Sequence, residues 1–181
     1  GVTRFLLEVL QSNKAAIRAY EKSGFVIARE FACYDLLPGA FAADKLNAGD
    51  FEVRVVDDAT VQTFQPQTDW QPSWEHSFAG MGRIQGDLLR LGAFKAGRCV
   101  GVLVYYPLLQ WIMCLVVDRD FRRKGVANAL LKDLMKDLRL PEGMDKVIVN
   151  NIDHSDTVMR AFIEKAGAVW VIDQYEMEFS L

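Results

Sequence analysis

Four cations crowd one short turn of this chain, between an apolar segment and an amphipathic one. The turn reads Val-Asp-Arg-Asp-Phe-Arg-Arg-Lys-Gly-Val-Ala over residues 117–127, and its cations are Arg119, Arg122, Arg123 and Lys124. Cations are unfavourable at a helix start, which already carries partial positive charge and unpaired N–H groups. A bound anion would compensate them, and the small residues Gly125 and Ala127 would let backbone N–H groups approach phosphate oxygens. The turn therefore predicts an anion site; the alternative is a solvated basic turn partly neutralised by Asp118 and Asp120.

Apolar patterns place this turn between two regular elements. Residues 111–117 form an apolar run typical of a buried strand, and residues 125–139 carry apolar side chains at helical spacing. Pro141 and Gly143 are expected to end that helix. A strand that leads into a helix is the arrangement that directs helix N–H groups at a phosphate.

Short strands and helices are expected along the rest of the chain. We predict strands at residues 5–10, 25–36, 51–56, 88–94, 99–106, 146–152 and 169–179, short helices and loops over 58–82, and a helix over 155–166. A further helix begins at Ser12 or Asn13 and stops at Gly24, a C-cap signal. Residues 37–50 show no strand alternation and predict a linker.

The start of the chain repeats its end. At an offset of 143 residues Gly24 falls on Gly167, and the Glu-Lys pair before each glycine also coincides. No part of residues 51–140 has a counterpart in the first copy, so residues 1–36 are interpreted as the back half of a second unit and 51–181 as a complete one. A lone strand–helix–strand cannot bury both faces, so we expect it to pack on the complete unit or on a partner chain as a homodimer.

Composition excludes several classes of function. Of 181 residues, 51% are hydrophobic and 25% charged, as in an ordinary globular protein, and the net charge of −3 gives no support for binding nucleic acid or a membrane surface. No apolar run is long enough to span a bilayer. The three cysteines and two histidines stand apart, which predicts no metal site, no disulfide framework and a reducing, cytoplasmic location.

The cationic turn resembles a known cofactor motif. Residues 122–127, Arg-Arg-Lys-Gly-Val-Ala, satisfy Gln/Arg-x-x-Gly-x-Gly/Ala, the pyrophosphate motif of the GNAT superfamily of acetyltransferases, between a strand and a helix as that motif requires. The strand–helix–Glu-Lys-x-Gly–strand near the C-terminus resembles the family's usual ending. The resemblance covers residues 51–181 as a whole domain and 5–36 as the ending only. It implies an α/β GNAT-type acyl-CoA N-acyltransferase fold, with a mixed, mostly antiparallel sheet flanked by helices.

The resemblance also implies a reaction: acetyl-CoA as co-substrate, and direct attack of a small-molecule or peptide amine on its thioester. The strand before the turn would pair with the pantetheine arm, the backbone amides of the turn would hold the pyrophosphate, and an N–H near Val117 would polarise the carbonyl. The implied cofactor-binding residues are Leu115, Val116, Val117, Arg122, Arg123, Lys124, Gly125, Val126, Ala127 and Asn128. The amine would approach loops 65–82, where Trp70 and Trp74 line a pocket or simply pack.

Two positions depart from the family pattern. Many members have an Asn near the start of the last helix and a Tyr four residues before the Gly, and the Tyr protonates the leaving thiolate. The N-terminal copy has Asn13 and Tyr20 there, whereas the complete unit has Asp156 and Ile163. Asp156 is more simply a helix N-cap.

Catalysis by the complete unit is therefore less well supported than cofactor binding. Asp118, Tyr105 and Cys114 are the candidate substitutes for the missing acid and base, although none stands at a motif position. Two alternatives to an active enzyme remain: a non-catalytic acyl-CoA-binding or sensor domain, and an interaction scaffold.

Overall fold

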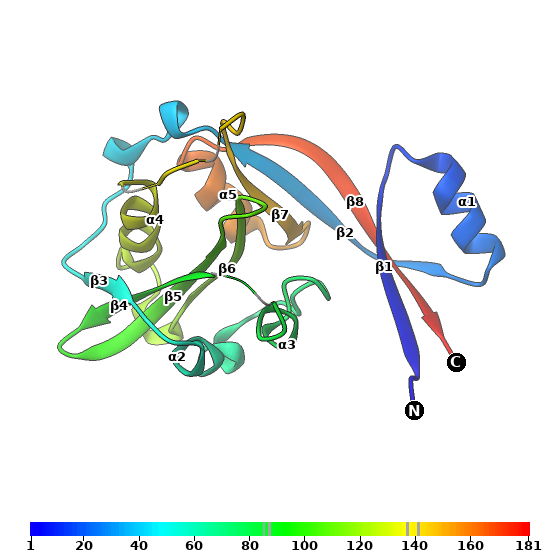
Figure 1. The fold of residues 1–181 in the computed structure, drawn as a ribbon, viewed down its shortest axis with the longest axis horizontal. Helices are drawn as coiled ribbons and strands as arrows, with labels where there is room; N and C mark the ends of the chain where they lie inside the picture. Colours follow the sequence, from blue (N-terminus) through cyan, green and yellow to red (C-terminus); the bar gives the residue numbers. More distant parts are fainter. Residues whose placement is uncertain (85, 87, 137, 141) are drawn as a thin grey trace.

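One eight-stranded sheet runs through the molecule in the order β1-β8-β2-β7-β6-β5-β4-β3 (Figure 1). The structure is a computed structural model that describes residues 1–84, 86, 88–136, 138–140 and 142–181. The strands are β1 (Arg4–Leu10), β2 (Val26–Leu36), β3 (Glu52–Val55), β4 (Leu89–Lys95), β5 (Arg98–Tyr106), β6 (Trp111–Val117), β7 (Val147–Asp153) and β8 (Val169–Ser180). The helices are α1 (Lys14–Lys22), α2 (Asp58–Gln62), α3 (Phe78–Met81), α4 (Val126–Lys136) and α5 (Thr157–Lys165).

These elements confirm the predicted ones to within a few residues. Asn13 caps α1, because its side chain accepts a hydrogen bond from the N–H of Ala16 at 3.1 Å. The predicted helix end at Pro141, with Asp137 before it, lies outside the described residues. Elements with a strong local signal, such as a cap or an apolar period, are those that sequence predicts best.

The sheet is mostly antiparallel, as expected. Among the described residues one parallel pair joins β6 to β7, and there the register holds at a single position, Trp111 opposite Ile148. Beyond that position the two strands separate, whereas β6 stays paired with β5 along its whole length. The sheet therefore opens between β6 and β7 toward the C-terminal ends of both strands.

The N-terminal segment, residues 1–36, supplies two strands of the same sheet, β1 and β2. Strand β1 pairs with β8 from Arg4 opposite Ser180 to Leu10 opposite Gln174, while β2 lies between β8 and β7. Helix α1 covers this end of the sheet, where Ile17 packs with Val9. The segment therefore packs on its own chain, and the homodimer stays a prediction; in Figure 1 both termini lie at this end.

Two core clusters lie on opposite faces of the central strands. Helices α4 and α5 cover one face, where Leu130 and Ile163 are fully buried. Helices α2 and α3 cover the other, around Val102 and Met113. The expected linker, residues 37–50, is not a free tether, because Leu46 is buried in the first cluster and the N–H of Ala42 donates to Ala166 O at 2.9 Å.

Candidate functional site

The cationic turn joins β6 to α4 with two residues in the left-handed backbone region. Arg123 has a φ of 61° and Gly125 a φ of 92°. A Cβ added at Gly125 would lie 2.6 Å from the carbonyl oxygen of Asn47, so only glycine fits this position without displacing backbone. Helix α4 begins directly afterwards at Val126. The turn thus places the unpaired N–H groups of an eleven-residue helix beside four cationic side chains.

The strand that leads into the turn has one free edge. Residues 115–117 of β6 pair with β5 on one side, for example Leu115 with Leu103. On the other side β7 has already separated, and the contact there is a hydrogen bond from Arg122 Nε to the carbonyl oxygen of Val117 at 3.3 Å. This edge has the geometry to accept an extended, hydrogen-bonding chain.

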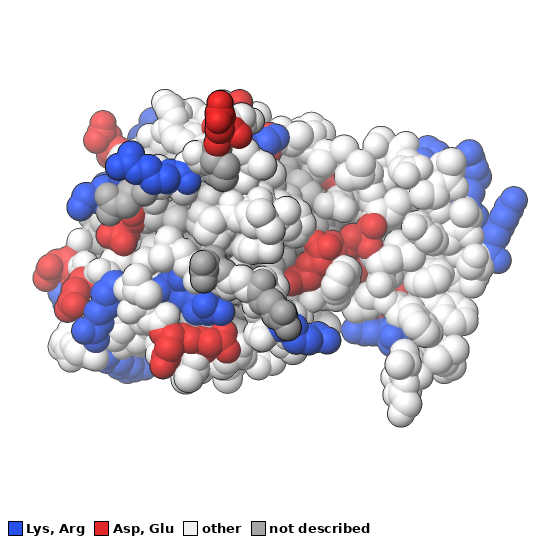
Figure 2. All heavy atoms as spheres, in the orientation of Figure 1, with Lys and Arg blue, Asp and Glu red and all other residues white. Residues whose placement is uncertain are grey.

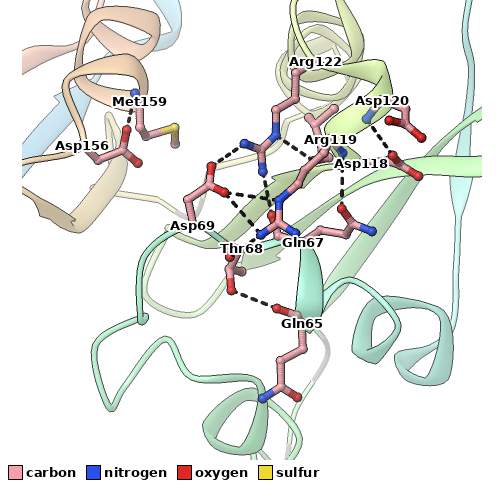
Figure 3. Close-up of polar contacts among 11 residues, drawn as sticks. Gln65, Gln67, Thr68, Asp69, Asp118, Arg119, Asp120, Arg122, Asp156 and Met159 are labelled. Atoms are coloured by element: carbon pink, nitrogen blue, oxygen red, sulfur yellow. Dashed lines mark hydrogen bonds and ion pairs between the residues drawn. The ribbon is translucent and has the colours of Figure 1, made fainter.

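Two of the four cations are held by a neighbouring loop (Figure 3). Arg122 forms an ion pair with Asp69 and donates to the carbonyl oxygen of Gln67 at 2.7 Å. Arg119 also reaches Asp69, at 3.4 Å, and donates to Thr68 O at 3.2 Å. The hydrogen bond from Arg122 lowers the pKa of Asp69. The loop around Gln67–Asp69 therefore sits directly against the turn.

Asp118 does not neutralise the turn in the way the sequence suggested. It is only 6% exposed, so the expectation of a solvated carboxylate was wrong. One oxygen pairs with Arg98, and the other accepts from the N–H of Asp120 at 2.9 Å, which caps the one-turn helix at 119–121. Asp69, from a loop far earlier in the chain, supplies the counter-charge instead.

The acetyltransferase (GNAT) family model matches residues 55–168, which include the turn, the free edge of β6 and the opening beside it. The chain belongs to the GNAT family of acetyltransferases. The matched span covers more than half of the chain and ends just after α5.

Solved structures share the whole fold at low sequence identity. A functionally unknown conserved protein from Staphylococcus epidermidis is 14% identical, with a TM-score of 0.71 over 98% of this chain and 73% of its own. GCN5-related N-acetyltransferases from Sphaerobacter thermophilus (17% identical, TM-score 0.64, 98% and 60% covered) and Kribbella flavida (12%, 0.65, 96% and 67%) are also similar. These likenesses confirm the predicted GNAT fold. No curated protein matches the chain.

The candidate catalytic residues of this GNAT domain are not gathered in one place. Tyr105 packs in the core cluster under α4, whereas Cys114 packs against the cluster on the opposite face. Burial raises the pKa of both groups, that of Cys114 to about 12, so its thiol stays neutral at physiological pH. Trp70 and Trp74 are 43% and 50% exposed on the loop that holds the arginines, away from buried Tyr105.

The family's usual tyrosine position offers no acid in this domain. Ile163 is fully buried in the main core cluster. Asp156 caps α5, since its side chain accepts from the N–H of Met159 at 2.9 Å, as expected (Figure 3). Tyr20 packs on Phe25, with ring centroids 5.9 Å apart, on the far side of β8 and β2. The family's tyrosine position therefore supplies no hydroxyl group in this domain.

Sequence reasoning missed a polar cluster in which side chains from β1 and β7 meet across β8 and β2. Asn151 donates to Glu8 Oε2 at 2.8 Å and lies 3.2 Å from Ser73 Oγ. No local motif marks these residues, and the one available signal was that Glu8 and Asn151 are equivalent in the 143-residue repeat. Among the described residues no group of His, Cys, Asp and Glu side chains could hold a metal, and none of the described helices is both long and apolar enough to cross a membrane.

Proposed function

We propose that this protein is an acetyl-CoA-dependent N-acetyltransferase that moves an acetyl group to a primary amine by direct attack. The observation that carries the proposal is the cationic turn at residues 122–127, which lies next to the free edge of β6. A phosphate-bearing ligand with an extended arm suits both features at once. The acceptor amine would enter where β6 and β7 separate, beside the loop that carries Trp70 and Trp74.

The chain's own groups would act mainly by positioning. The backbone of residues 115–117 would align the arm of the thioester substrate as an added strand, and the N–H groups from Arg122 to Asn128 would bind its pyrophosphate. Asn128 is already anchored, because its Nδ2 donates to the carbonyl oxygen of Asn47 at 2.5 Å. A neutral amine would then attack the thioester carbonyl, forming the C–N bond as the C–S bond breaks, and the departing thiolate would take up a proton.

A second candidate function is favoured by the buried Ile163. A domain without the family's acid could bind acyl-CoA as a sensor and transfer nothing. Calorimetry with acetyl-CoA, followed by measurement of free thiol release with a broad panel of amines, separates the two functions. Binding with turnover supports the enzyme and binding without turnover supports the sensor. Failure to bind coenzyme A contradicts both.

Replacing Gly125 with alanine tests the turn. We expect at least a tenfold loss of acetyl-CoA affinity, because the new Cβ would collide with the backbone of residues 47–49 and displace the N–H groups of the turn. The matched control is Gly97→Ala, which carries the same left-handed backbone (φ of 78°) in open space, with no atom within 4 Å of the added Cβ. Calorimetry is the measurement. Equal affinities in the two variants would show that the turn does not bind the cofactor.

Replacing Asp69 with asparagine should have the opposite effect. Arg122 and Arg119 would be released from the carboxylate and a negative charge beside the phosphates would disappear, so we expect acetyl-CoA affinity to rise about threefold to tenfold at low salt. The control is Asp58→Asn, which breaks an ion pair with Arg90 outside the turn. The gain should shrink as salt is added. A loss of affinity would mean that Asp69 orders the turn instead of competing with the ligand.

A further inference from the structure

The Glu8 side chain reaches over β8 and β2 to contact Asn151 on β7, in the stretch of β7 that no longer pairs with β6. Its partner Asn151 lies three residues beyond Ile148, the last position at which β7 pairs with β6. Ser73, which is only 1% exposed and lies in the loop between α2 and α3, also contacts the Asn151 side chain. Glu8 belongs to β1, outside the residues that match the family model, so this carboxylate is brought to the domain by the N-terminal segment.

An irregularity in β7 directs Asn151 toward Glu8. The register between β2 and β7 shifts between Ala32 and Tyr34, where β7 holds an extra residue, and Asn151 has a φ of 58°. A bulge of this kind turns a side chain away from the regular direction of the strand. The amide of Asn151 thereby meets its repeat equivalent, Glu8, and not a neighbour on β2.

The Glu8 carboxyl group is incompletely satisfied. Its Oε1 is buried and has no hydrogen-bond partner, and no described Lys or Arg lies within ion-pair distance of Glu8 or of Glu75 beside it. The guanidinium of Arg29 on β2 is already occupied by Glu176 at 2.7 Å and by the carbonyl oxygen of Pro72 at 3.2 Å. A bare carboxylate in such surroundings is costly unless a cation or a proton completes it.

The loop between α2 and α3 supplies a second buried polar group without a hydrogen-bond partner among the described residues. His76, next to Glu75 in the chain, is 7% exposed and its Nε2 has no partner. Burial lowers the pKa of His76 to about 4, so the imidazole is neutral and does not serve as the missing cation. In Figure 2 Asp and Glu side chains gather where the part built from β1 and α1 meets the rest of the molecule.

The charge environment sets the pKa of Glu8 near physiological pH. Burial, and then repulsion by Glu75, raise this pKa to about 7, although hydrogen bonds from Asn151 and Ser73 lower it. The elements around Glu8 also carry ionisable and charged groups. These are Glu75 and His76 in the loop between α2 and α3, Arg29 and Cys33 on β2, Asp153 on β7 and Glu176 on β8. A carboxyl group poised near pH 7 beside a reaction site is suited to accept a proton.

We propose that Glu8 is the general base of this acetyl transfer and that Glu8 and Glu75 together receive the ammonium group of a cationic alkylamine acceptor. This inference rests on the proposed function. The ammonium group donates to the partly exposed carboxyl group of Glu8 and gives it one proton. The resulting neutral amine attacks the thioester carbonyl and forms the C–N bond. The thiolate of coenzyme A leaves with the electron pair of the C–S bond and takes up the second proton, which the nitrogen loses. An acceptor with a carboxylate next to its amine is disfavoured by the two glutamates.

The first arm of the test measures acetyl transfer to n-butylamine against pH. Wild type should gain kcat/KM as pH rises through about 7, because the base must be deprotonated. Glu8→Gln should lose about 10²- to 10⁴-fold in kcat/KM and lose this pH dependence, with an unchanged Kd for acetyl-CoA. Glu8→Asp should restore part of the rate, and Glu30→Gln, on the exposed part of β2, should match wild type. A Glu8→Gln enzyme with the wild-type rate and pH profile would overturn the proposal.

The second arm keeps the amine site testable if wild type shows no turnover. The side-chain carboxyl carbons of ¹³C-labelled glutamate are followed by NMR while pH is varied, with and without n-butylammonium, and Glu8→Gln assigns the signal. Bound ammonium should lower the apparent pKa of Glu8 by half a unit or more, whereas tetramethylammonium, which has no N–H to donate, should not. Absence of turnover together with this shift would reject acetyl transfer but retain the amine site. Absence of the shift would overturn the site.

Discussion

Substituting alanine for Gly167 is expected to lower the free energy of unfolding by about 4 kcal/mol. Gly167 has a φ of 101°, and an added Cβ would lie only 2.2 Å from the carbonyl oxygen of Ala40. That oxygen belongs to the segment between β2 and β3, which is anchored by Leu46 in the core and by the bond from Ala42 N to Ala166 O. Neither backbone segment can move away without a large energetic cost. The strain of the left-handed conformation therefore adds to the steric clash with Ala40.

Gly24 is a matched control for this substitution, because it occupies the equivalent position in the repeat. Its φ of 92° gives alanine the same backbone cost, but the nearest atom to an added Cβ is the edge of the Phe179 ring at 3.0 Å. We expect Gly24→Ala to cost only about 1–2 kcal/mol. Urea unfolding with an unchanged m-value measures both changes. Equal losses would show that the conformation of the turn, and not the contact with Ala40, makes glycine necessary.

The pH dependence of stability should reveal two opposed buried groups. Burial lowers the pKa of His76 from an ordinary 6.5 to about 4. Between these pH values the unfolded chain therefore binds a proton at His76 that the folded chain does not bind. Stability from this group is present above pH 6.5 and is lost as pH falls toward 4, by about 3 kcal/mol in all. Glu8, whose pKa is raised from 4.5 to about 7, acts in the opposite direction. Its contribution is present below pH 4.5 and is lost as pH rises through 7, by about 1–2 kcal/mol because solvent reaches part of the group.

Single substitutions should separate the two contributions to the pH dependence of stability, that of His76 and that of Glu8. His76→Phe keeps the edge-on packing against Trp111, removes the unpartnered nitrogen and leaves Glu8 alone, so its stability should fall between about pH 5 and pH 7. Glu8→Gln leaves His76 alone, so its stability should rise over the same range. Urea titrations at half-unit pH steps provide the measurement. Parallel curves for the two variants would mean that neither group controls the pH response.

Local sequence signals were sufficient for the elements and for choosing the candidate cofactor turn. Asn13 and Asp156 cap the helices they were expected to cap, since a cap depends on the hydrogen bonds of one helical turn. The small residue at Gly125 and the strand–turn–helix context could also be read from neighbouring residues. The assignment of Arg122 to Ala127 as the candidate phosphate-binding turn needed no tertiary information.

Contacts between distant segments could be decided only by the tertiary structure. Sequence left open whether the N-terminal segment packs on its own chain, and pairing across nearly the whole chain places β1 and β2 on either side of β8. The same arrangement brings Glu8 to Asn151, Asp69 to Arg122, and Tyr105 and Cys114 to different clusters. Residue spacing reports the period of a helix or strand, but strand order is set by which faces must be buried together. The sequence by itself therefore determined which turn is the candidate phosphate-binding site, and the folded sheet decided that Glu8 meets Asn151, because that contact depends on strand order.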